Sequence, residues 1–280
     1  MGKGKPDAAV AFSAIASPLV DSAVEQARHI AREPAAEGIH QLRVALRNLL
    51  TLWWLYRPLI GAEEYARQRG CLKSIASAAG KARDYDILIE LLSRHGKCSA
   101  AGIAAIYVAR EAALQAGREI LSPPHIQTCL LKTLTQTEAS LRAKPRQLRL
   151  GALAEARIAK SRRQLRQRIK RAITTNKPDI EAFHDVRKAG KKTRYLLELF
   201  GPLLPKDHHR LLKRLKKIQQ PLGELNDLAA SESLLRQNLR LISTPDQAKK
   251  LERWLKRKRK RRQSTLACTL RQDWQSKRPG

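Results

Sequence analysis

Residues 34–60, PAAEGIHQLRVALRNLLTLWWLYRPLI, and residues 178–204, PDIEAFHDVRKAGKKTRYLLELFGPLL, are two copies of one pattern. With a shift of 144 residues, His40 aligns with His184 and Arg43 with Arg187; the other matched pairs are Pro34 and Pro178, Glu37 and Glu181, and Pro58 and Pro202. The chain therefore contains an internal duplication, and each copy should form the same kind of element.

Apolar residues in the first copy recur at steps of three and four, which predicts a helix with one buried face: Ile39, Leu42, Leu46, Leu49 and Trp53. His40, Arg43 and Arg47 follow the same steps one residue later, so they form a polar stripe beside the apolar seam. The second copy has His184, Arg187, Lys191 and Arg194 on this stripe, flanked by Lys188 and Lys192. Pro34 and Pro178 are expected in the first turns of their helices, where proline is tolerated.

A second repeated block follows the first. With one gap, LKSIASAAGKARD (72–84) aligns with LKKIQQPLGELND (215–227), which pairs Gly80 with Gly223 and Asp84 with Asp227. We therefore expect one domain, 1–280, built from two pseudosymmetric helical bundles. The first half covers about 8–122, the second 150–272, and 123–149 is a connecting helix or linker.

Helical periodicity runs through the whole chain and strand-like alternation is nearly absent, so the fold class is all-α. The expected helices are 8–32, 35–57, 62–79, 84–95, 99–120, 125–142, 150–173, 179–200, 206–220, 226–241 and 246–272. Breaks are expected at prolines and glycines, including Gly80, Pro123–Pro124, Pro145, Pro178 and Pro205.

Charge is unevenly distributed along the chain. The formal net charge is +31, yet residues 1–140 hold 17 Lys and Arg against 13 Asp and Glu, while residues 141–280 hold 39 against 12. A positive field of this size concentrates polyanions around the protein. Only 3 Phe, 4 Trp and 5 Tyr are present, so the chain can hold phosphates but has few rings on which bases could stack.

Other composition features exclude several classes of protein. Cys71, Cys98, Cys129 and Cys268 form no CxxC pair, which argues against a cysteine zinc site and predicts reduced thiols in a cytoplasmic protein. No apolar stretch approaches the ~18–20 residues of a membrane span, and the N-terminus lacks the core of a signal peptide. We therefore expect no membrane association.

Four motifs occur in order along the chain: H-x-x-R-V-x-x-R from His40, G-x-x-R-D-x-D from Gly80, H-x-x-R-K-x-x-K-x-x-R-Y from His184, and L-G-x-x-N-D from Leu222. Together they resemble the CHAD family, the conserved histidine α-helical domain, over about residues 10–270. The resemblance implies long antiparallel helices in two pseudosymmetric halves with a basic central cavity or groove. It also implies binding of inorganic polyphosphate and association with polyphosphate granules.

Carried over onto this sequence, the resemblance indicates two sets of polyphosphate-binding residues: His40, Arg43 and Arg47 in the first copy, and His184, Arg187, Lys188, Lys191 and Arg194 in the second. Val44 and Leu50 replace Lys188 and Arg194 in the first copy, so the second half should dominate affinity. Further basic rows at helical spacing are candidates as well: Arg163, Arg166 and Lys170; and Arg210, Lys213, Arg214 and Lys217. A third row, Arg253, Lys256, Arg257 and Lys260, lies in the densely basic C-terminal run.

A polyphosphate chain carries closely spaced negative oxygens and no bases, so it needs repeated point charges on a rigid support. Helical steps of three and four place cations about one turn, ~5.4 Å, apart on one face. Arg grips phosphate oxygens with two parallel hydrogen bonds, and Lys acts as a point charge. We expect non-catalytic binding of inorganic polyphosphate in the cytoplasm, with no cofactor and no metal.

Alternative interpretations stay open at this point. A single basic row can be a solvated helix face, and the paired histidines can be structural. Asp84, Asp86 and Asp227 are expected as helix caps or as anchors for basic side chains rather than as metal ligands. His184–Asp185 resembles the dipeptide of HD phosphohydrolases, but Gln41 replaces the aspartate in the first copy. The alternative functions are a nucleoid-type nucleic-acid binder, with weak nucleic-acid binding expected in any case, and a polyphosphate-processing enzyme.

Overall fold

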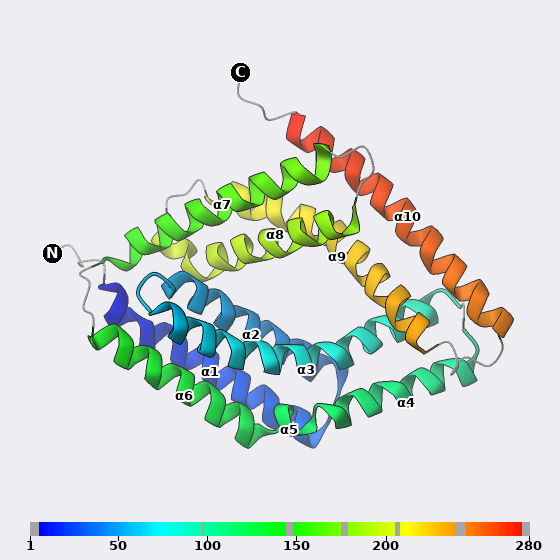
Figure 1. Cartoon of the computed structure of the whole chain (residues 1–280), viewed down its shortest axis with the longest axis horizontal. Coiled ribbons are helices and arrows are strands. Elements are labelled where there is room, and N and C mark those ends of the chain that lie inside the picture. The colour runs from blue at the N-terminus through cyan, green and yellow to red at the C-terminus, as the bar shows by residue number, and fades with distance from the viewer. Residues whose placement is uncertain are drawn as a thin grey trace. The chain divides into compact units, whose positions relative to one another are not determined.

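The computed structural model describes residues 6–96, 98–143, 148–174, 179–204, 208–238 and 245–275, and these residues form helices without a β-strand. The predicted all-α class is therefore confirmed. Figure 1 shows the elements in chain order: α1 (Ala8–Arg32), α2 (Ala36–Tyr56), α3 (Ala62–Arg94), α4 (Ala100–Ala116), α5 (Arg118–Leu121), α6 (Pro123–Ala143), α7 (Leu150–Thr174), α8 (Ile180–Phe200), the 3-10 turn η1 (Gly201–Leu203), α9 (His208–Gln237) and α10 (Pro245–Gln275).

The helices divide into two compact units. Unit 1 contains Met1–Arg83, Arg110–Arg157 and Leu199–Leu204, and unit 2 contains Asp84–Ala109, Ile158–Glu198 and Pro205–Gly280. This division follows spatial contacts and differs from the two sequence repeats. The repeat-based halves, their pseudosymmetry and the basic central cavity all stay predictions.

Unit 1 is built around α1, whose buried face packs against α2 and α6. Phe12 lies edge-on to the Trp53 ring, with centroids 5.2 Å apart. The Trp53 indole N–H donates to Gln68 Oε1 at 2.8 Å and to Thr137 Oγ1 at 3.1 Å. These bonds satisfy the one polar group of a ring that is 1% exposed, so α2, α3 and α6 are joined inside the core.

In unit 2, apolar side chains of α3, α4, α9 and α10 form one buried cluster: Leu88, Ile89, Leu92, Ile106, Leu228, Leu235, Ala248, Leu251 and Leu255. Beside it, the 4%-exposed carboxylate of Glu232 accepts from Arg236 Nη2 at 2.8 Å and Arg259 Nε at 2.5 Å. The buried charge is therefore paired on both oxygens, and it links α9 to α10.

Two expected breaks are wrong. Helix α3 continues through Gly80, and α9 continues through Pro221 and Gly223. A glycine in a helix costs only about 1 kcal/mol and packing can override this cost. Consequently Asp84, Asp86 and Asp227 lie inside helices, and their expected role as caps at helix starts is wrong.

Other boundaries also differ from expectation. The expected helix 99–120 is interrupted at Gly117, between α4 and α5. Pro34 precedes α2, whose N-cap is Ala35, so it does not lie in the first turn. The expected breaks at Pro145, Pro178 and Pro205 lie outside the described residues, as do parts of the expected helices 206–220 and 226–241.

The cysteines contradict the expectation of four free thiols. Cys71 on α3 and Cys129 on α6 form a disulfide with Cα atoms 6.5 Å apart, and Cys98 and Cys268 are free. Both bonded residues belong to unit 1 and both are half-buried. Their separation of 58 residues gives no sequence signal for the pairing.

Helix α1 was not recognised in the sequence as apolar enough for a membrane span. By length and composition alone, Ala8–Arg32 meets that criterion among the described helices. A core helix meets the same criterion, and the apolar face of α1 is buried against α2 and α6.

Candidate anion-binding site

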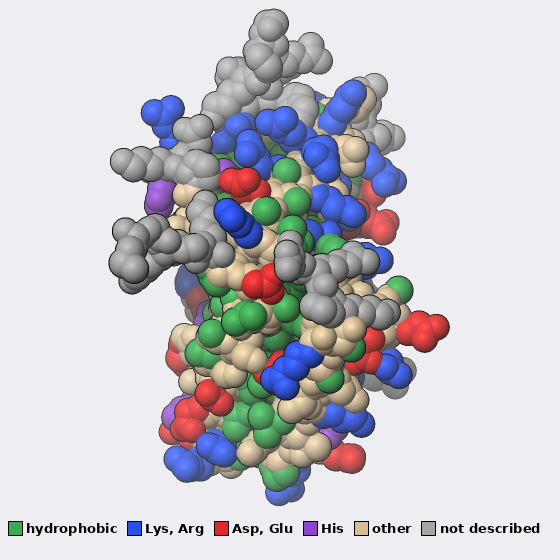
Figure 2. Space-filling view, turned by 90° about the vertical axis from the view of Figure 1, so that its left-hand side faces the viewer, with side chains coloured by type: hydrophobic (Ala, Val, Ile, Leu, Met, Phe, Trp, Pro, Cys, Tyr) green, Lys and Arg blue, Asp and Glu red, His purple; other side chains and the backbone are tan. Residues whose placement is uncertain are grey.

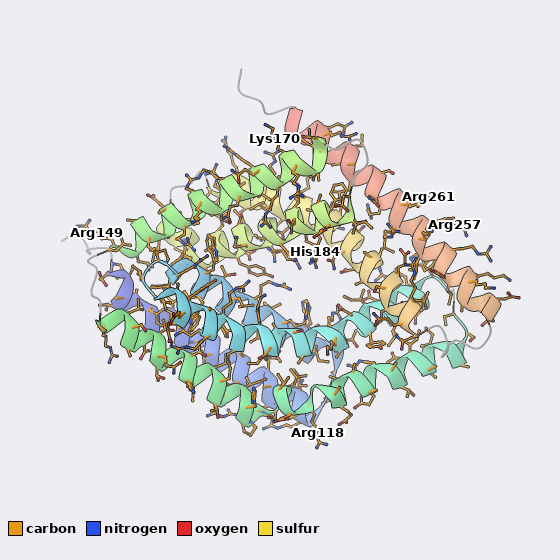
Figure 3. All side chains as sticks on the ribbon, viewed as in Figure 1. Arg118, Arg149, Lys170, His184, Arg257 and Arg261 are labelled. Atoms are coloured by element: carbon orange, nitrogen blue, oxygen red, sulfur yellow. A yellow bond between two sulfur atoms is a disulfide. The ribbon has the colours of Figure 1, made fainter. Side chains whose placement is uncertain are left out.

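Helix α8 carries the basic stripe of the second copy along the edge of its buried face. Phe183 and Val186 are 1% and 0% exposed, whereas the cations beside them are half-buried: His184 (labelled in Figure 3), Arg187, Lys191 and Arg194. Lys188 is exposed. The half-buried cations are therefore only partly accessible to solvent, and the Nε atoms of Arg187 and Arg194 are buried.

His184 is oriented by a residue of α9. Its Nδ1 lies 2.8 Å from Asn226 Oδ1, while the Asn226 amide nitrogen is 3.4 Å from Asp227 Oδ1. Because an amide oxygen can only accept, Nδ1 carries the proton in this arrangement. The other ring nitrogen, Nε2, is left to take up a second proton.

Burial lowers the pKa of His184 below its ordinary value of 6.5, and the positive charge of Lys188 lowers it further. The hydrogen bond that His184 donates to Asn226 acts in the opposite direction. Without a ligand, the imidazole is therefore neutral at neutral pH. A phosphate beside it would favour the protonated form and would gain a charged donor.

Contacts with α7 hold α8 in place. Ser161 Oγ and Thr193 Oγ1 share a buried hydrogen bond of 2.8 Å, and Lys192 Nζ donates to Gln164 Oε1 at 2.9 Å. These bonds place the predicted stripe on a fixed support inside unit 2, as a row of phosphate ligands requires.

The C-terminal end of the stripe is partly neutralised. Glu198 Oε2 lies 3.7 Å from Arg194 Nε, and its other oxygen lies 3.9 Å from Lys216 Nζ. The Arg194 guanidinium also lies 4.7 Å from the centre of the Tyr195 ring. We therefore expect the segment from His184 to Lys191 to contribute more to anion binding than Arg194.

In unit 1, the first copy places His40, Arg43 and Arg47 on α2, all half-buried. The Arg43 side chain reaches α3 and donates from Nη1 to the Ala76 carbonyl at 3.2 Å. A Cβ atom at Gly80 would lie 2.5 Å from that same Nη1, so the glycine leaves the space that the guanidinium occupies. One donor of the first stripe is therefore already used within the protein.

His40 has a charged neighbour where His184 has an amide. Burial lowers its pKa most, then the positive charge of Arg83, while Glu37 acts in the opposite direction. In the second repeated block, Arg83 aligns with Asn226. The same repeat position therefore lies close to the histidine in each copy, with a cation in one and a neutral amide in the other.

Comparison with known families decides the relationship. A model of the family described as "CHAD domain" matches residues 14–236. The chain belongs to the CHAD domain family. This family is commonly linked to polyphosphate binding. No curated protein matches the chain.

Solved structures agree with the CHAD fold. The structure described as "Crystal structure of the CHAD domain from the plant Ricinus communis" is 20% identical, with a TM-score of 0.79 over 94% of this chain and 90% of that one. PptA from Streptomyces chartreusis is 14% identical, with a TM-score of 0.65 over 96% of this chain and 100% of that one. At these identities the similarity concerns the fold.

The remaining predicted rows of this CHAD protein lie on α7, α9 and α10. The row on α10 is exposed: Arg253, Lys256, Arg257 and Lys260. Arg163, Arg166 and Lys170 are exposed on α7, and Lys170 lines a shallow hollow with Gln167, Arg171 and Thr174. On α9, Arg210, Lys213 and Lys217 are exposed and Arg214 is half-buried. In the upper part of the face drawn in Figure 2, Lys and Arg side chains gather with few Asp or Glu among them, whereas Asp and Glu are more frequent lower on that face. The role of each row in binding stays a prediction.

Two neighbours of the histidines were missed as individual site residues. Arg83 and Asn226 were quoted only as letters within motifs, although each lies 42 or 43 positions from its histidine. The repeat itself could have indicated these two residues, because the histidine motif and the block that contains Arg83 or Asn226 occur together in both copies. Across the part of the chain that the structure describes, no three His, Cys, Asp or Glu side chains form a group that could hold a metal ion.

Proposed function

We propose that this CHAD protein binds inorganic polyphosphate through the basic stripe of α8, without chemically converting it. The observation that carries the proposal is the row His184, Arg187 and Lys191 at the edge of a buried helix face, with His184 held by Asn226. This stripe offers closely spaced positive charges on a helix that hydrogen bonds attach to α7.

The electrostatics of the sequence support a chain-like anion. Residues 141–280 carry 39 basic against 12 acidic residues, so a long run of phosphates meets little repulsion on α7, α8 and α9. The stripe in unit 1 should contribute less, since Val44 and Leu50 replace two of its cations.

We also propose that the protein acts in the cytoplasm, at polyphosphate granules. Thiols stay reduced there, so Cys71 and Cys129 would be free in that compartment. Alkylation of rapidly quenched cells with a thiol reagent measures this directly. A pair that resists the reagent until reduced would argue for an oxidising compartment.

Calorimetric titration with polyphosphates of graded length tests the binding site. Arg187→Ala/Lys191→Ala should weaken binding about 100-fold at low salt, because each lost charge-assisted contact is worth about 1.5 kcal/mol. The matched control, Arg257→Ala/Lys260→Ala, removes the same two charges from α10, where both residues are exposed and Arg257 projects outward (Figure 3). The control should lose less than about fivefold.

Equal losses in the two variants would show that net charge alone drives binding and would contradict a site on α8. Thermal melting of each variant separates loss of binding from loss of fold. The affinity for polyphosphate should fall steeply with added salt whether the anion binds a defined site or associates non-specifically with the positive surface. The salt dependence therefore does not discriminate between the two.

Nucleic-acid binding is the second candidate, which the net charge of +31 favours. In a competition at equal phosphate concentration, long polyphosphate should displace single-stranded DNA from the protein. Displacement in the reverse order would favour a nucleoid-type role. Release of phosphate from polyphosphate with magnesium, abolished by His184→Ala, would instead favour an enzyme.

A further inference from the structure

A buried arginine in unit 1 lies outside both histidine stripes. Arg157 on α7 is 6% exposed, and its guanidinium carbon lies 3.6 Å from the centre of the Trp54 ring. One Nη atom donates to the Trp54 carbonyl, whereas the buried Nε has no hydrogen-bond partner. An unsatisfied donor on a buried cation is costly, so this side chain is not explained by its contact with Trp54 alone.

Two further arginines surround the same place. The Arg57 guanidinium lies 5.3 Å from the centre of the Tyr65 ring, and the charges of Arg57, Arg69 and Arg157 all act on the Tyr65 hydroxyl. Tyr65 is 8% exposed, whereas Arg57 and Arg69 are exposed and leave access from solvent. Cations from α3, α7 and the end of α2 therefore all act electrostatically on one buried phenol.

No acidic side chain balances these charges within the described residues. Among the ion pairs of the described residues, none involves Arg57, Arg69 or Arg157. The nearby Glu64 is paired with Arg67. Burial lowers the pKa of Arg157 to about 10, with Tyr65 acting to raise it and Arg57 to lower it, and the guanidinium still stays charged at neutral pH. Such repulsion among like charges favours an anion that the described chain itself does not provide.

From this convergence we infer that Arg57, Tyr65, Arg69 and Arg157 form a second, compact oxyanion site that binds a single phosphoryl group. The oxygens of one phosphoryl group can accept from several converging guanidinium forks, which match phosphate geometry. A carboxylate has two oxygens and would leave more of these donors unused. The inference does not depend on polyphosphate binding by α8.

Titration with inorganic orthophosphate at constant ionic strength, set with chloride, tests the site. Wild-type protein should bind orthophosphate, and Arg57→Gln should weaken this binding about tenfold, the loss of one charge-assisted hydrogen bond. Arg67→Gln removes the same charge from the exposed face of α3, outside the cluster, and should change the affinity less than twofold. Because Arg157→Gln could unfold unit 1, Arg69→Gln serves as the second variant, with a similar loss expected.

Absence of orthophosphate binding by the wild-type protein would overturn the inference, as would an equal loss in Arg67→Gln. The two sources of the phosphoryl group are separated by polyphosphate whose ends are esterified. If the site takes chain ends, Arg57→Gln weakens uncapped chains but leaves capped chains unchanged. If the site takes free phosphate, Arg57→Gln leaves the binding of both capped and uncapped chains unchanged. Arg187→Ala/Lys191→Ala should leave orthophosphate binding intact, so failure of the α8 proposal and failure of this one are distinguishable.

Discussion

At the scale of single residues, His184 couples the site to pH. Its pKa is lowered by burial and by Lys188, so the folded protein holds fewer protons at this position than the unfolded chain just below pH 6.5. Stability without ligand should therefore fall as the pH drops through that window. His40, lowered by burial and by Arg83, acts in the same direction.

Bound polyphosphate should instead favour the protonated form of His184, because a neighbouring phosphate stabilises the imidazolium. We expect affinity to increase by up to about tenfold from pH 7.5 to pH 5.5, the effect of one added charged hydrogen bond. His184→Gln should flatten most of this dependence, whereas His125→Gln, an exposed histidine on α6, should preserve it. Titrations at both pH values measure the effect, and an unchanged slope in His184→Gln would make the histidine purely structural.

The residues of the candidate site were predicted from the sequence, but the side chains that contact them were not visible there. His40 and His184 follow from the repeat, and so do the arginines one turn later. The Asn226 contact depends on how α9 packs against α8, and the Arg157 cluster combines residues up to 100 positions apart. No helical period relates such residues, so only the packed structure brings them together.

At the scale of elements, the long helices α3 and α9 show where local signals fail. The glycine and proline residues predicted helix breaks near Gly80 and Pro221. Each helix nevertheless has buried apolar residues before and after the expected break: Leu72, Ile75 and Leu88 on α3, and Leu215, Leu222 and Leu225 on α9. A continuous buried face outweighs one unfavourable residue. Most other helices were predicted from periodicity to within a few residues.

Two matched substitutions test this continuity. Gly223→Ala on α9 meets no atom within 4 Å, so a continuous helix should gain about 0.5–1 kcal/mol in its free energy of unfolding. Gly80→Ala on α3 gains the same helix propensity, but the added methyl group displaces Arg43 from the Ala76 carbonyl. The increase in its free energy of unfolding should therefore be smaller. Chemical denaturation measures both. Destabilisation by Gly223→Ala would mean that α9 does break there.

At the scale of the whole molecule, the Cys71–Cys129 disulfide is the feature that composition hid most completely. Two half-buried cysteines 58 residues apart give no pattern, because pairing depends on α3 lying beside α6. In contrast, the excess of positive charge and the all-α class can both be determined from the sequence. What a sequence cannot show is which distant side chains become neighbours.

Reduction of this disulfide should lower the free energy of unfolding by about 4 kcal/mol, the chain-entropy value for a loop of this length. Urea unfolding with and without dithiothreitol measures the difference, and Cys71→Ser/Cys129→Ser should be insensitive to the reductant. Cys98→Ser/Cys268→Ser, which removes the two free thiols, should respond as the wild-type protein does. A transition that dithiothreitol leaves unchanged would contradict a disulfide in the purified protein.

The bridge between α3 and α6 also makes the intervening chain a covalent ring that includes α4 and α5. A protease that cuts once within residues 72–128 should therefore yield a nicked molecule that migrates as one species on a non-reducing gel and as two fragments after reduction. Such a molecule could lose a peptide bond in this ring and still keep both of its pieces.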